Sequence, residues 1–447
     1  MLSQAFAPDP RAFFADLDLA GRKSLVAAVS GGGDSLALLF LLRDYLQTVD
    51  NAPSLLAVTV DHGLRAESAG EARRVAEVCG AYDIAHRVVT WRGPKPSTGV
   101  AAAAREARLA LLAEVAGEAG SDLVMTGHTA DDQAETLAMR LARGEGRGAA
   151  GIAPATLYAG RVWFVRLLLG TRRADLRRFL RGRGLSWIED PSNRDPRFER
   201  VRVRGRLGEK EIGRLVHRAR QMAAERKDAG EKVAALIVAS ADRPAPGLLR
   251  LSRPAFEVAD EKTANDTLRL LLAVAGGTPH LPEAMRAAKL LQRAERTRGR
   301  ASLSRAVVSL RGEQIFLHRE RRNLPRCAAA DEIVWDGRYR ISGLGGGAGV
   351  LLGPYGAENA RAADIAGHEA PSGLVRAALA AEPALWKGER CLALAAQRPD
   401  LSVRPLAGPW AWLLPCFDLA PARAVARVIG TARGPDLPLR RHKGQHQ

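Results

Sequence analysis

The sequence predicts an α/β protein built on a doubly wound, mostly parallel sheet, followed by a helical domain and a small α+β C-terminal domain. Short apolar segments alternate with helix-length segments over the first 205 residues, which is the pattern of a parallel sheet covered by helices on both faces. The first apolar segment runs directly into a glycine cluster, as a buried strand does when it ends at a ligand-binding edge. After residue 205 the pattern becomes helical and polar, so we expect the sheet to end there.

The strands and helices of this first part alternate along the chain. Four strands are expected from short apolar segments that end at polar or glycine residues, at 24–29, 55–61, 86–90 and 122–126. Four helices follow them, at 35–46, 67–81, 100–116 and 130–143. Three of the strands end in polar clusters, at Ser30, at Asp61 and at Gly127-His128. Because ligands bind outside the carboxyl ends of parallel strands, we expect these clusters to lie at one edge of the sheet.

The rest of the chain is specified less clearly by its pattern. Polar helices are expected at 211–231, 265–274 and 282–294, and short strands at 306–310 and 314–317. The part beyond residue 320 is rich in Gly, Pro and Ala, which leaves its fold poorly defined. We therefore expect an N-terminal extension, an α/β domain, a mostly helical domain and a C-terminal domain, at 1–22, 23–205, 206–320 and 321–447.

Positive charge is the main feature of the composition. The 447 residues carry 67 Lys and Arg against 49 Asp and Glu, a net charge of +18. The segment 161–220 alone holds 18 Lys and Arg against 7 Asp and Glu. A solvated arginine-rich face would have the same composition, but so concentrated an excess favours contact with a polyanion, above all a nucleic acid.

Cysteine spacing and hydropathy exclude several classes of protein. The four cysteines, at 79, 327, 391 and 416, are far apart and form no CxxC motif. Neither a disulfide framework nor a zinc site is therefore expected. The first residues lack the regions of a signal peptide, and no apolar run is long enough to span a membrane. We expect a cytoplasmic protein without membrane contact.

The segment Ser30-Gly31-Gly32-Gly33-Asp34-Ser35 lies between the first strand and the first helix. Glycines let the backbone approach an anion closely, and the start of the following helix presents free N–H groups and a positive dipole end. Ser30 and Ser35 can add hydroxyl donors. Asp34 would repel a phosphate unless a cation lay between them, and Mg²⁺ would remove the repulsion. A glycine-rich turn with an aspartate helix cap is the alternative.

A second glycine-rich segment, Gly343–Gly349, shows that glycine alone does not indicate a phosphate site. It contains neither serine nor aspartate, and the apolar segment 350–354 follows it instead of a helix. We interpret it as a surface loop without a ligand. The buried strand before Ser30–Ser35 and the polar residues within it are what favour ATP phosphates there.

Two further polar clusters follow the second and fourth strands. The first, Asp61-His62-Gly63-Leu64-Arg65, could be a cap and a turn or part of a nucleotide site. In the second, helical spacing brings four side chains near one another around the first turn and a half: His128, Asp131, Asp132 and Glu135. Adjacent carboxylates at a strand end suit a metal or catalysis on a phosphate ester, whereas a solvated helix start is the alternative.

Taken together, these motifs resemble a known family. Ser30–Ser35 looks like the SGGxDS loop of the PP-loop (N-type) ATP pyrophosphatases, and the ordered set is similar to that of the tRNA(Ile)-lysidine synthetases. The matching segments lie within about 23–205 and are DHGLR (61–65), AAREARL (103–109), GHTADDQAET (127–136), RLARG (140–144), Arg166-Leu167-Leu168 and Trp187–Asn193. Val201 stands where the family has Asn after Arg200. The C-terminal part matches only weakly, at Arg404-Pro405-Leu406.

The resemblance implies an ATP-dependent carbon–nitrogen ligase that modifies a tRNA. In the implied reaction, ATP adenylates O2 of the wobble cytidine in the CAU anticodon of an isoleucine tRNA and pyrophosphate is released. The ε-amine of L-lysine then attacks C2, AMP leaves, and lysidine is formed. The implied fold is a Rossmann-like PP-loop catalytic domain at 23–205, followed by a tRNA-recognition domain at 206–320. ATP and Mg²⁺ are the implied substrate and cofactor, and both a monomer and a homodimer are compatible with the sequence.

Candidate residues follow for each part of this reaction. The expected ATP contacts are Ser30, Gly31, Gly32, Gly33, Asp34, Ser35, Asp61, His62, Arg65 and Gly127. The expected catalytic residues are Asp34, His128, Asp131, Asp132 and Glu135, with a carboxylate of 131–135 as the base for lysine. Mg²⁺ is expected on Asp34, with Asp131 or Asp132 as the second ligand. The expected tRNA contacts are Arg105, Arg143, Arg166, Asn193, Arg200 and Arg204.

Three aromatic residues have expected places in the fold, and two alternative functions remain open. Phe198 lies among charges and is the candidate for base stacking, whereas Trp163 and Trp187 lie in apolar stretches and are expected in the core. A related PP-loop enzyme could thiolate tRNA, but this needs reactive cysteines, and Cys79 is the only cysteine in the first 320 residues. A non-catalytic RNA-binding protein with a vestigial nucleotide site is the other alternative. The intact Ser, Gly and Asp residues of the motifs argue against it.

Overall fold

The chain folds into two units. The computed structural model describes residues 9–64, 67–144, 146–190, 195–293, 298–344 and 349–440. The first unit contains the described residues up to 226, together with 415–417 and 435–440, and the second contains the remainder. The division falls inside one long helix, α8 (Glu209–Ser240), and not at residue 205. None of the described helices is both long and apolar enough to cross a membrane.

Strands and helices alternate along the first unit. Its elements before α8 are α1 (Pro10–Phe14), β1 (Ser24–Ala28), α2 (Gly33–Leu46), β2 (Ser54–Asp61), α3 (Ser68–Ala81), β3 (Ala85–Thr90), α4 (Val100–Glu118), β4 (Leu123–Thr126), α5 (Ala130–Leu141), the 3-10 helix η1 (Arg147–Ala150), β5 (Ala155–Tyr158), β6 (Val162–Val165), α6 (Arg173–Gly182) and α7 (Glu199–Arg204). The four strands and four helices predicted between residues 24 and 143 are all present.

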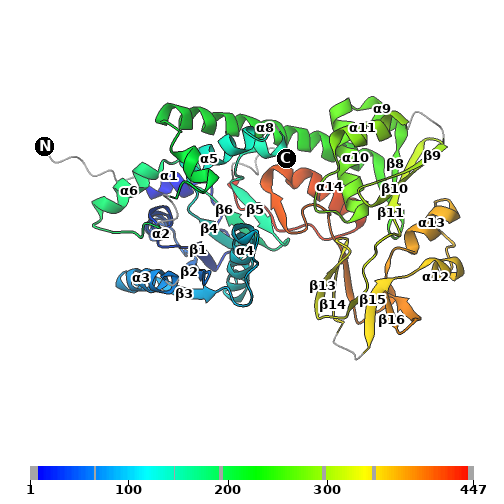
Figure 1. Ribbon diagram of the computed structural model, residues 1–447, viewed down its shortest axis with the longest axis horizontal. Coiled ribbons are helices and arrows are strands. Elements are labelled where there is room, and N and C mark those ends of the chain that lie inside the picture. The colour runs from blue at the N-terminus through cyan, green and yellow to red at the C-terminus, as the bar shows by residue number, and fades with distance from the viewer. Residues whose placement is uncertain are drawn as a thin grey trace. The chain divides into compact units, whose positions relative to one another are not determined.

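The strands of this unit form a mostly parallel sheet in the order β5-β6-β4-β1-β2-β3 (Figure 1). Parallel pairs join β1 to β2 and β4, β2 to β3, and β4 to β6, whereas β5 is antiparallel to β6. Both faces of β1 are covered, because Val26 packs with residues of α4 and its neighbours Leu25 and Ala27 are also fully buried. The predicted doubly wound α/β fold is therefore confirmed.

The strand order reverses at β1. The strand that follows it in the chain, β2, lies on one side, and β4 lies on the other. A crevice outside the carboxyl ends of the strands is expected at such a reversal, and it is where open α/β sheets bind ligands. The three polar clusters follow β1, β2 and β4, so all three lie at this edge of the sheet.

The first unit also includes residues that come late in the sequence. Leu17 and Leu439 form an antiparallel bridge, and both side chains are buried. The Asp18 N–H donates to the carbonyl of Pro438 (3.0 Å), and the N–H of residue 440 donates to the carbonyl of residue 16 (2.7 Å). Phe417 packs against two alanines near η1. Residues that follow most of the second unit in the sequence therefore complete the core of the first.

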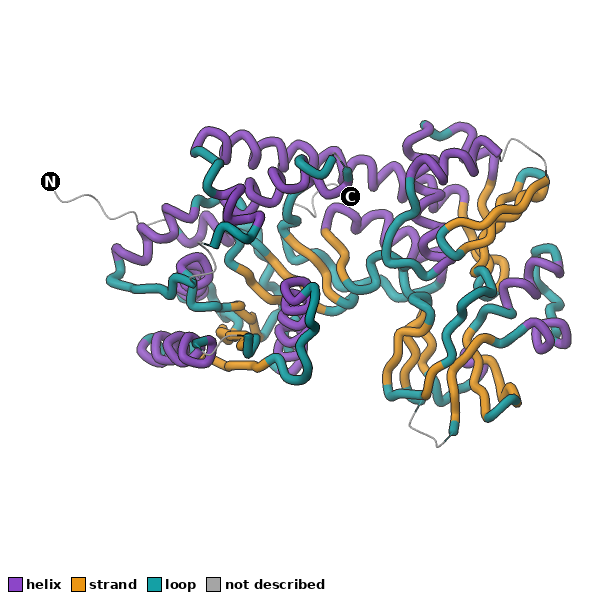
Figure 2. Tube along the Cα trace, in the orientation of Figure 1, coloured by secondary structure: helices purple, strands orange, loops and turns teal. Residues whose placement is uncertain are grey.

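The second unit combines helices with antiparallel sheets (Figure 2). Its strands form a five-stranded sheet β7-β8-β11-β10-β9, a four-stranded sheet β12-β15-β16-β17 and a three-stranded sheet β13-β14-β18. The elements after α8 are β7 (Ala241–Ala245), β8 (Leu248–Ser252), α9 (Arg253–Val258), α10 (Glu261–Gly276), α11 (Ala284–Arg293), β9 (Arg298–Leu303), β10 (Ala306–Arg311), β11 (Gln314–Arg319), β12 (Cys327–Ala328), β13 (Glu332–Trp335), β14 (Tyr339–Ser342), β15 (Val350–Pro354), α12 (Ala357–Ala362), α13 (Ser372–Leu379), β16 (Pro383–Lys387), β17 (Arg390–Leu394), the 3-10 helix η3 (Ala395–Gln397), β18 (Ser402–Pro405), β19 (Leu413–Pro415), the 3-10 helix η4 (Cys416–Asp418) and α14 (Leu419–Ile429).

The five-stranded sheet makes the region before residue 320 less helical than the sequence suggests. The predicted helices are present as α8, α10 and α11, and the two predicted strands as β10 and β11. The sequence pattern did not predict β7, β8 or β9, of which β7 and β9 are the two edge strands of the sheet and β8 is an inner strand. Edge strands need no continuous apolar run, and β7 carries a proline as edge strands can. Of the glycine-rich segment 343–349, residues 345–348 lie outside the described residues.

Candidate active site

The glycine loop between β1 and α2 is held by hydrogen bonds of its own serines. Ser35 Oγ accepts from the N–H of Ser30 (3.1 Å) and donates to the carbonyl of Gly32 (2.9 Å). Among the described residues, no side chain caps the start of helix α2, which follows the loop. The Ser35 N–H donates to the Gly32 carbonyl (3.1 Å), so the N–H groups of Gly33 and Asp34 at the start of α2 are the ones available to an anion.

A second segment covers the loop from outside. The N–H of Ile188 donates to the carbonyl of Gly31 (2.9 Å), and Trp187 lies over Gly33. Gly31 has a φ of +81°, and a Cβ added there would lie 2.6 Å from Ile188 Cδ1. The left-handed φ favours glycine at this position, and the Ile188 side chain would have to move to admit a Cβ.

Gly127 brings the end of β4 against the same loop. A Cβ at this position would lie 2.7 Å from the carbonyl oxygen of Asp34 and 3.0 Å from the Cα of Ser35. Only a residue without a side chain allows the two backbones to approach this closely. The polar residues after β4 therefore lie directly beside the glycine loop, as the order of the strands predicted.

The α5 helix places three carboxylates at this point through a capping box at its start. The hydroxyl of Thr129 accepts from the N–H of Asp132 (3.3 Å), and Asp132 Oδ2 accepts from the N–H of Thr129 (2.8 Å). This cap fixes Asp132 Oδ2 and turns Oδ1 away from the helix end. One turn later, the side chain of Glu135 is only 2% exposed. A solvated helix start, the alternative for this segment, does not fit that burial.

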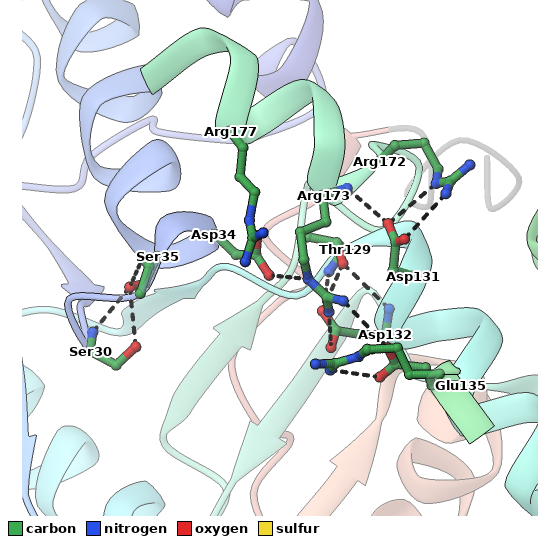
Figure 3. A network of polar contacts seen from close by, with 12 residues as sticks. Ser30, Asp34, Ser35, Thr129, Asp131, Asp132, Glu135, Arg172, Arg173 and Arg177 are labelled. Carbon is green, nitrogen blue, oxygen red and sulfur yellow. Dashed lines mark hydrogen bonds and ion pairs between the residues drawn. The ribbon is translucent and has the colours of Figure 1, made fainter. Parts of the chain in front are cut away.

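Arg173, the first residue of α6, joins Asp34 to the carboxylates of α5 (Figure 3). Its Nε donates to Asp34 Oδ2 (2.9 Å). Its Nη2 donates to Asp132 Oδ1 (3.1 Å), and its Nη1 to Glu135 Oε1 (3.4 Å). Burial raises the pKa of Asp34, although Arg173 beside it acts in the opposite direction. One guanidinium thus gathers carboxylates from two helices.

Asp131 is held on the other side of the helix start. It accepts from the backbone N–H of Arg173 (2.8 Å) and from two nitrogens of the Arg172 guanidinium (3.3 Å each). Burial raises the pKa of Asp131, but these hydrogen bonds outweigh it, and the pKa lies below its ordinary value. Asp132, and not Asp131, therefore shares a guanidinium with Asp34.

Two arginines of α7 complete the cluster. Arg204 Nε donates to Glu135 Oε1 (2.6 Å), and Arg200 Nε donates to Glu135 Oε2 (2.8 Å). Arg200 also lies 3.4 Å from Asp132 Oδ1. Both arginines were expected on tRNA phosphates, but in this structure they bind carboxylates. Four arginines thus face four carboxylates, and their formal charges balance.

Two basic residues at the same edge have only neutral partners. Arg166, after β6, donates to the carbonyls of Ala153 (2.9 Å) and Phe164 (3.2 Å), and burial lowers its pKa to about 10. Its side chain is buried, so the tRNA contact expected of Arg166 does not fit the structure. His128 Nδ1 shares a hydrogen bond with the hydroxyl of Thr126 (3.0 Å). Burial lowers the pKa of His128 well below 6.5, so its ring is neutral at pH 7.

Of the residues at the end of β2, Asp61 forms a turn, whereas a ring nitrogen of His62 has no partner among the described residues. Asp61 Oδ1 accepts from the N–H of Gly63 (2.8 Å), which is the simpler of the two roles expected for it. His62 Nδ1 is buried and has no hydrogen-bond partner among the described residues. Burial lowers the pKa of His62, and the charge of Arg108 lowers it further, so this nitrogen can accept a hydrogen bond from a ligand.

Two other expected tRNA contacts lie at the surface, and a third, with one expected ATP contact, lies outside the described residues. Arg143 forms an ion pair with Glu199 at the surface, and Arg105 is exposed on α4. Arg65 and Asn193 lie outside the described residues. Sequence reasoning missed Arg172 and Arg173. A signal was present, because two arginines at a helix N-terminus oppose the helix dipole and need anionic partners.

The three aromatic residues differ in burial. Trp163 is fully buried in the sheet, which confirms its expected place in the core. Trp187 is half-buried and contacts the glycine loop at Gly33. Phe198, before α7, is 51% exposed. Its ring is therefore accessible for stacking, and this role stays a prediction.

A metal ion would find oxygen ligands in this cluster. The described residues contain no group of three or more His, Cys, Asp or Glu side chains arranged to hold a metal. Asp34 Oδ1, however, is buried and has no hydrogen-bond partner among them. Mg²⁺ is commonly bound by one or two carboxylates, with phosphate and water oxygens completing its shell. An unpaired carboxylate oxygen beside a phosphate-binding loop fits that coordination.

Known proteins that are similar to this chain in sequence belong to one family. The PP-loop domain family matches residues 4–211. The tRNA(Ile)-lysidine synthase of Mesorhizobium japonicum is 50% identical over 430 residues, which cover 93% of this chain and 94% of that protein. Those of Rhizobium meliloti and Brucella canis are 38% and 37% identical, over 93% and 95% of this chain and 94% and 98% of theirs. Because this identity extends through both units, the chain belongs to the tRNA(Ile)-lysidine synthase family.

Proposed function

We propose that this chain uses ATP to adenylate the wobble cytidine of a CAU-anticodon isoleucine tRNA and then joins L-lysine to C2 of that base. The observation that carries the proposal is the meeting of the glycine loop with the carboxylates of α5, where Gly127 touches the backbone of Asp34. The reaction needs a place for a polyphosphate and a place for an ammonium group side by side. This edge of the sheet supplies both.

ATP phosphates are proposed to bind at Ser30–Ser35. The N–H groups at the start of α2 would hold the pyrophosphate as it leaves, without a covalent enzyme intermediate. The unpaired Nδ1 of His62 lies after β2, the neighbouring strand, and is proposed to accept a hydrogen bond from the nucleotide. Asp61 is proposed to support this contact through its turn.

Asp34 and Asp132 are the residues that would hold Mg²⁺. Of the two candidates for the second ligand, Asp131 and Asp132, Asp132 is the better supported, because Asp132 Oδ1 and Asp34 Oδ2 bind the same guanidinium. Asp131 is held on the other side by Arg172. When bound, the metal would neutralise charge on the phosphates that leave.

The lysine ammonium is proposed to bind at Glu135, because Asp132 is the proposed metal ligand. Carboxylates attract the ammonium, and one of them must take its proton before the amine attacks C2. The buried Glu135 is the stronger candidate for binding, because desolvation strengthens its interaction with a cation. His128 is neutral at pH 7 and is therefore a second candidate for the base.

The anticodon loop is proposed to contact exposed residues around the cluster. Arg105 and Arg143 present charge at the surface, and Phe198 presents an exposed ring. Arg200 and Arg204 are partly exposed, at 41% and 33%, so phosphates could reach them as well. A splayed loop held by such contacts would bring an unstacked base to the site.

The direct test is nucleoside analysis of the product tRNA. The protein is incubated with ATP, Mg²⁺, L-lysine and an isoleucine tRNA that carries the CAU anticodon. We expect a cytidine that is heavier by one lysine less one water by mass spectrometry. The same tRNA with a GAU anticodon is the control and should remain unmodified. Absence of the heavier nucleoside with folded protein and the correct tRNA would refute the proposal.

The structure gives little support to thiolation. Cys79 is fully buried in α3, and burial raises the pKa of its thiol to about 11. A thiol of this kind is protonated and inaccessible at neutral pH, so it is a poor nucleophile. Of the other cysteines, Cys327 and Cys391 belong to the second unit, whereas Cys416 belongs to the first and lies within electrostatic range of Arg166.

A further inference from the structure

Arg173 has no role in the function proposed so far, yet it is the residue around which the carboxylates are arranged. Among the described residues, it is the arginine that forms an ion pair with Asp34, and it also binds Asp132 and Glu135. Its side chain is only 15% exposed. Arg172, the preceding residue, contacts Asp131 instead. Arg173 therefore occupies the place where a cationic ligand of these carboxylates would bind.

The oxygens that Arg173 holds are the ones that a metal would need. Asp132 Oδ2 is used by the cap of α5, where it accepts from Thr129. Its other oxygen, Oδ1, is bound by Arg173 at 3.1 Å and lies 3.4 Å from Arg200. Asp34 has one oxygen on Arg173 and one unpaired. Asp34 and Asp132 would therefore be able to hold a metal together only if Arg173 left Asp132 Oδ1.

The displaced guanidinium has another anion within reach. Asp34 is the second residue of α2, and the phosphates of ATP are proposed to bind at the first turn of that helix. Arg173 Nε lies 2.9 Å from the Asp34 carboxylate, so a change of side-chain torsions would carry the guanidinium to that turn. Arginine binds phosphate oxygens in a forked geometry, which compensates for the lost carboxylates.

We propose that Arg173 is a resident cation of the carboxylate cluster that exchanges partners when ATP and its metal bind. Without ligands it holds Asp34, Asp132 and Glu135 together and prevents their mutual repulsion. With ATP and metal it gives up Asp34 and Asp132 to the metal and pairs with the phosphates. Arg173 is thus a positioning residue for the carboxylates and a phosphate ligand in turn. This inference rests on the ATP and metal site proposed above.

The exchange predicts changes of opposite sign in two binding constants. In Arg173→Met, Mn²⁺ should bind the ATP-free protein more tightly, by roughly tenfold, because a competing charge beside the carboxylates is gone. ATP at saturating Mg²⁺ should bind more weakly, by a similar factor, because a phosphate ligand is lost. Electron paramagnetic resonance of free Mn²⁺ and calorimetry with ATP measure the two constants. Arg173→Lys keeps the charge but not the fork, so its Mn²⁺ affinity should stay near that of the wild type.

A matched control lies on the same helix. Arg178 of α6 is 55% exposed and pairs with Asp175, and it is not one of the four arginines that bind the carboxylate cluster, so Arg178→Met removes one charge from the same helix. Both constants should remain at the wild-type values in this variant. Arg173→Met with unchanged or weaker Mn²⁺ binding would overturn the proposal, since it would show that Arg173 does not compete with cations. If Arg173→Met does not fold, Arg173→Lys decides, because unchanged ATP affinity there would refute a forked contact with phosphate.

The two proposals fail in different assays. If the wild type forms no lysidine, the proposed function is refuted, whatever the two binding constants are. If the wild type forms lysidine and binds ATP, but neither binding constant changes in Arg173→Met, only the exchange is refuted.

Discussion

Replacement of Gly127 by alanine tests whether the end of β4 and the glycine loop form one site. The added Cβ would lie 2.7 Å from the Asp34 carbonyl oxygen, 2.9 Å from its carbonyl carbon and 3.0 Å from the Ser35 Cα. All three are backbone atoms at the start of α2, so no flexible side chain can move aside. Overpacking of this kind costs about 1–3 kcal/mol. The relief must come from a shift of the loop, which should lower the affinity for ATP by roughly tenfold.

Gly117→Ala is the matched control for this substitution. Gly117 lies within α4, and a Cβ there would meet no atom within 4 Å. Alanine in a helix interior is favoured over glycine by about 0.5–1 kcal/mol, so the control should be as stable as the wild type or more stable. Thermal unfolding and calorimetric titration with ATP measure both variants. A loss of 1 kcal/mol should lower the unfolding temperature by about 2–4 °C in a unit of this size.

The reasoning fails if Gly127→Ala keeps the wild-type unfolding temperature and ATP affinity. That result would mean that β4 and the loop separate at little cost, and the cluster after β4 would then not be fixed to the phosphate site. A loss of stability with full ATP affinity would also count against the argument, because the strain would then be relieved away from the loop.

Three further predictions concern single side chains. Asp34→Asn should abolish pyrophosphate release in a coupled assay and leave tRNA binding in a gel-shift assay unchanged. Because the pKa of Asp34 is raised in the folded state, its ionised form lowers the stability of the protein at pH 7. The Asn variant should therefore unfold at a higher temperature than the wild type at pH 7. This rise in unfolding temperature should vanish below about pH 4, where the carboxyl is protonated in both the folded and the unfolded state. Glu135→Gln should lower lysidine formation more than pyrophosphate release. The ratio of pyrophosphate released to lysidine formed should therefore exceed that of the wild type, and an unchanged ratio would contradict the prediction. Cys79→Ala should form lysidine at the wild-type rate, and a lost product would revive a role for the thiol.

The sheet and the edge that carries the site were predictable because local pattern decides them. Strands such as β1 are buried on both faces and therefore read as continuous apolar segments. The reversal of strand order at β1 then brings the three polar clusters to one edge. Gly127 was expected in the ATP site. The reason why a glycine is needed there, the close approach to the backbone of Asp34, is seen only in the three-dimensional structure.

The partners of the carboxylates could not be read from the sequence. Asp34 and Arg173 are 139 residues apart, and no local pattern links them. Arg200 and Arg204 were expected on tRNA because they lie in a strongly basic segment, but net charge says nothing about which individual side chains are already paired. Arg166 shows the same limit, since burial and not composition decides whether an arginine can meet a ligand.

The bridge between Leu17 and Leu439 has a consequence for synthesis on the ribosome. The first unit draws residues 415–417 and 435–440 into its interior, so translation must pass through the second unit before the first can close. A nascent chain that stops before residue 435 leaves Leu17 without its bridge partner Leu439 and exposes apolar surface to chaperones and proteases. The nucleotide site is built early in the chain, yet we expect it to reach full stability only after most of the message has been read.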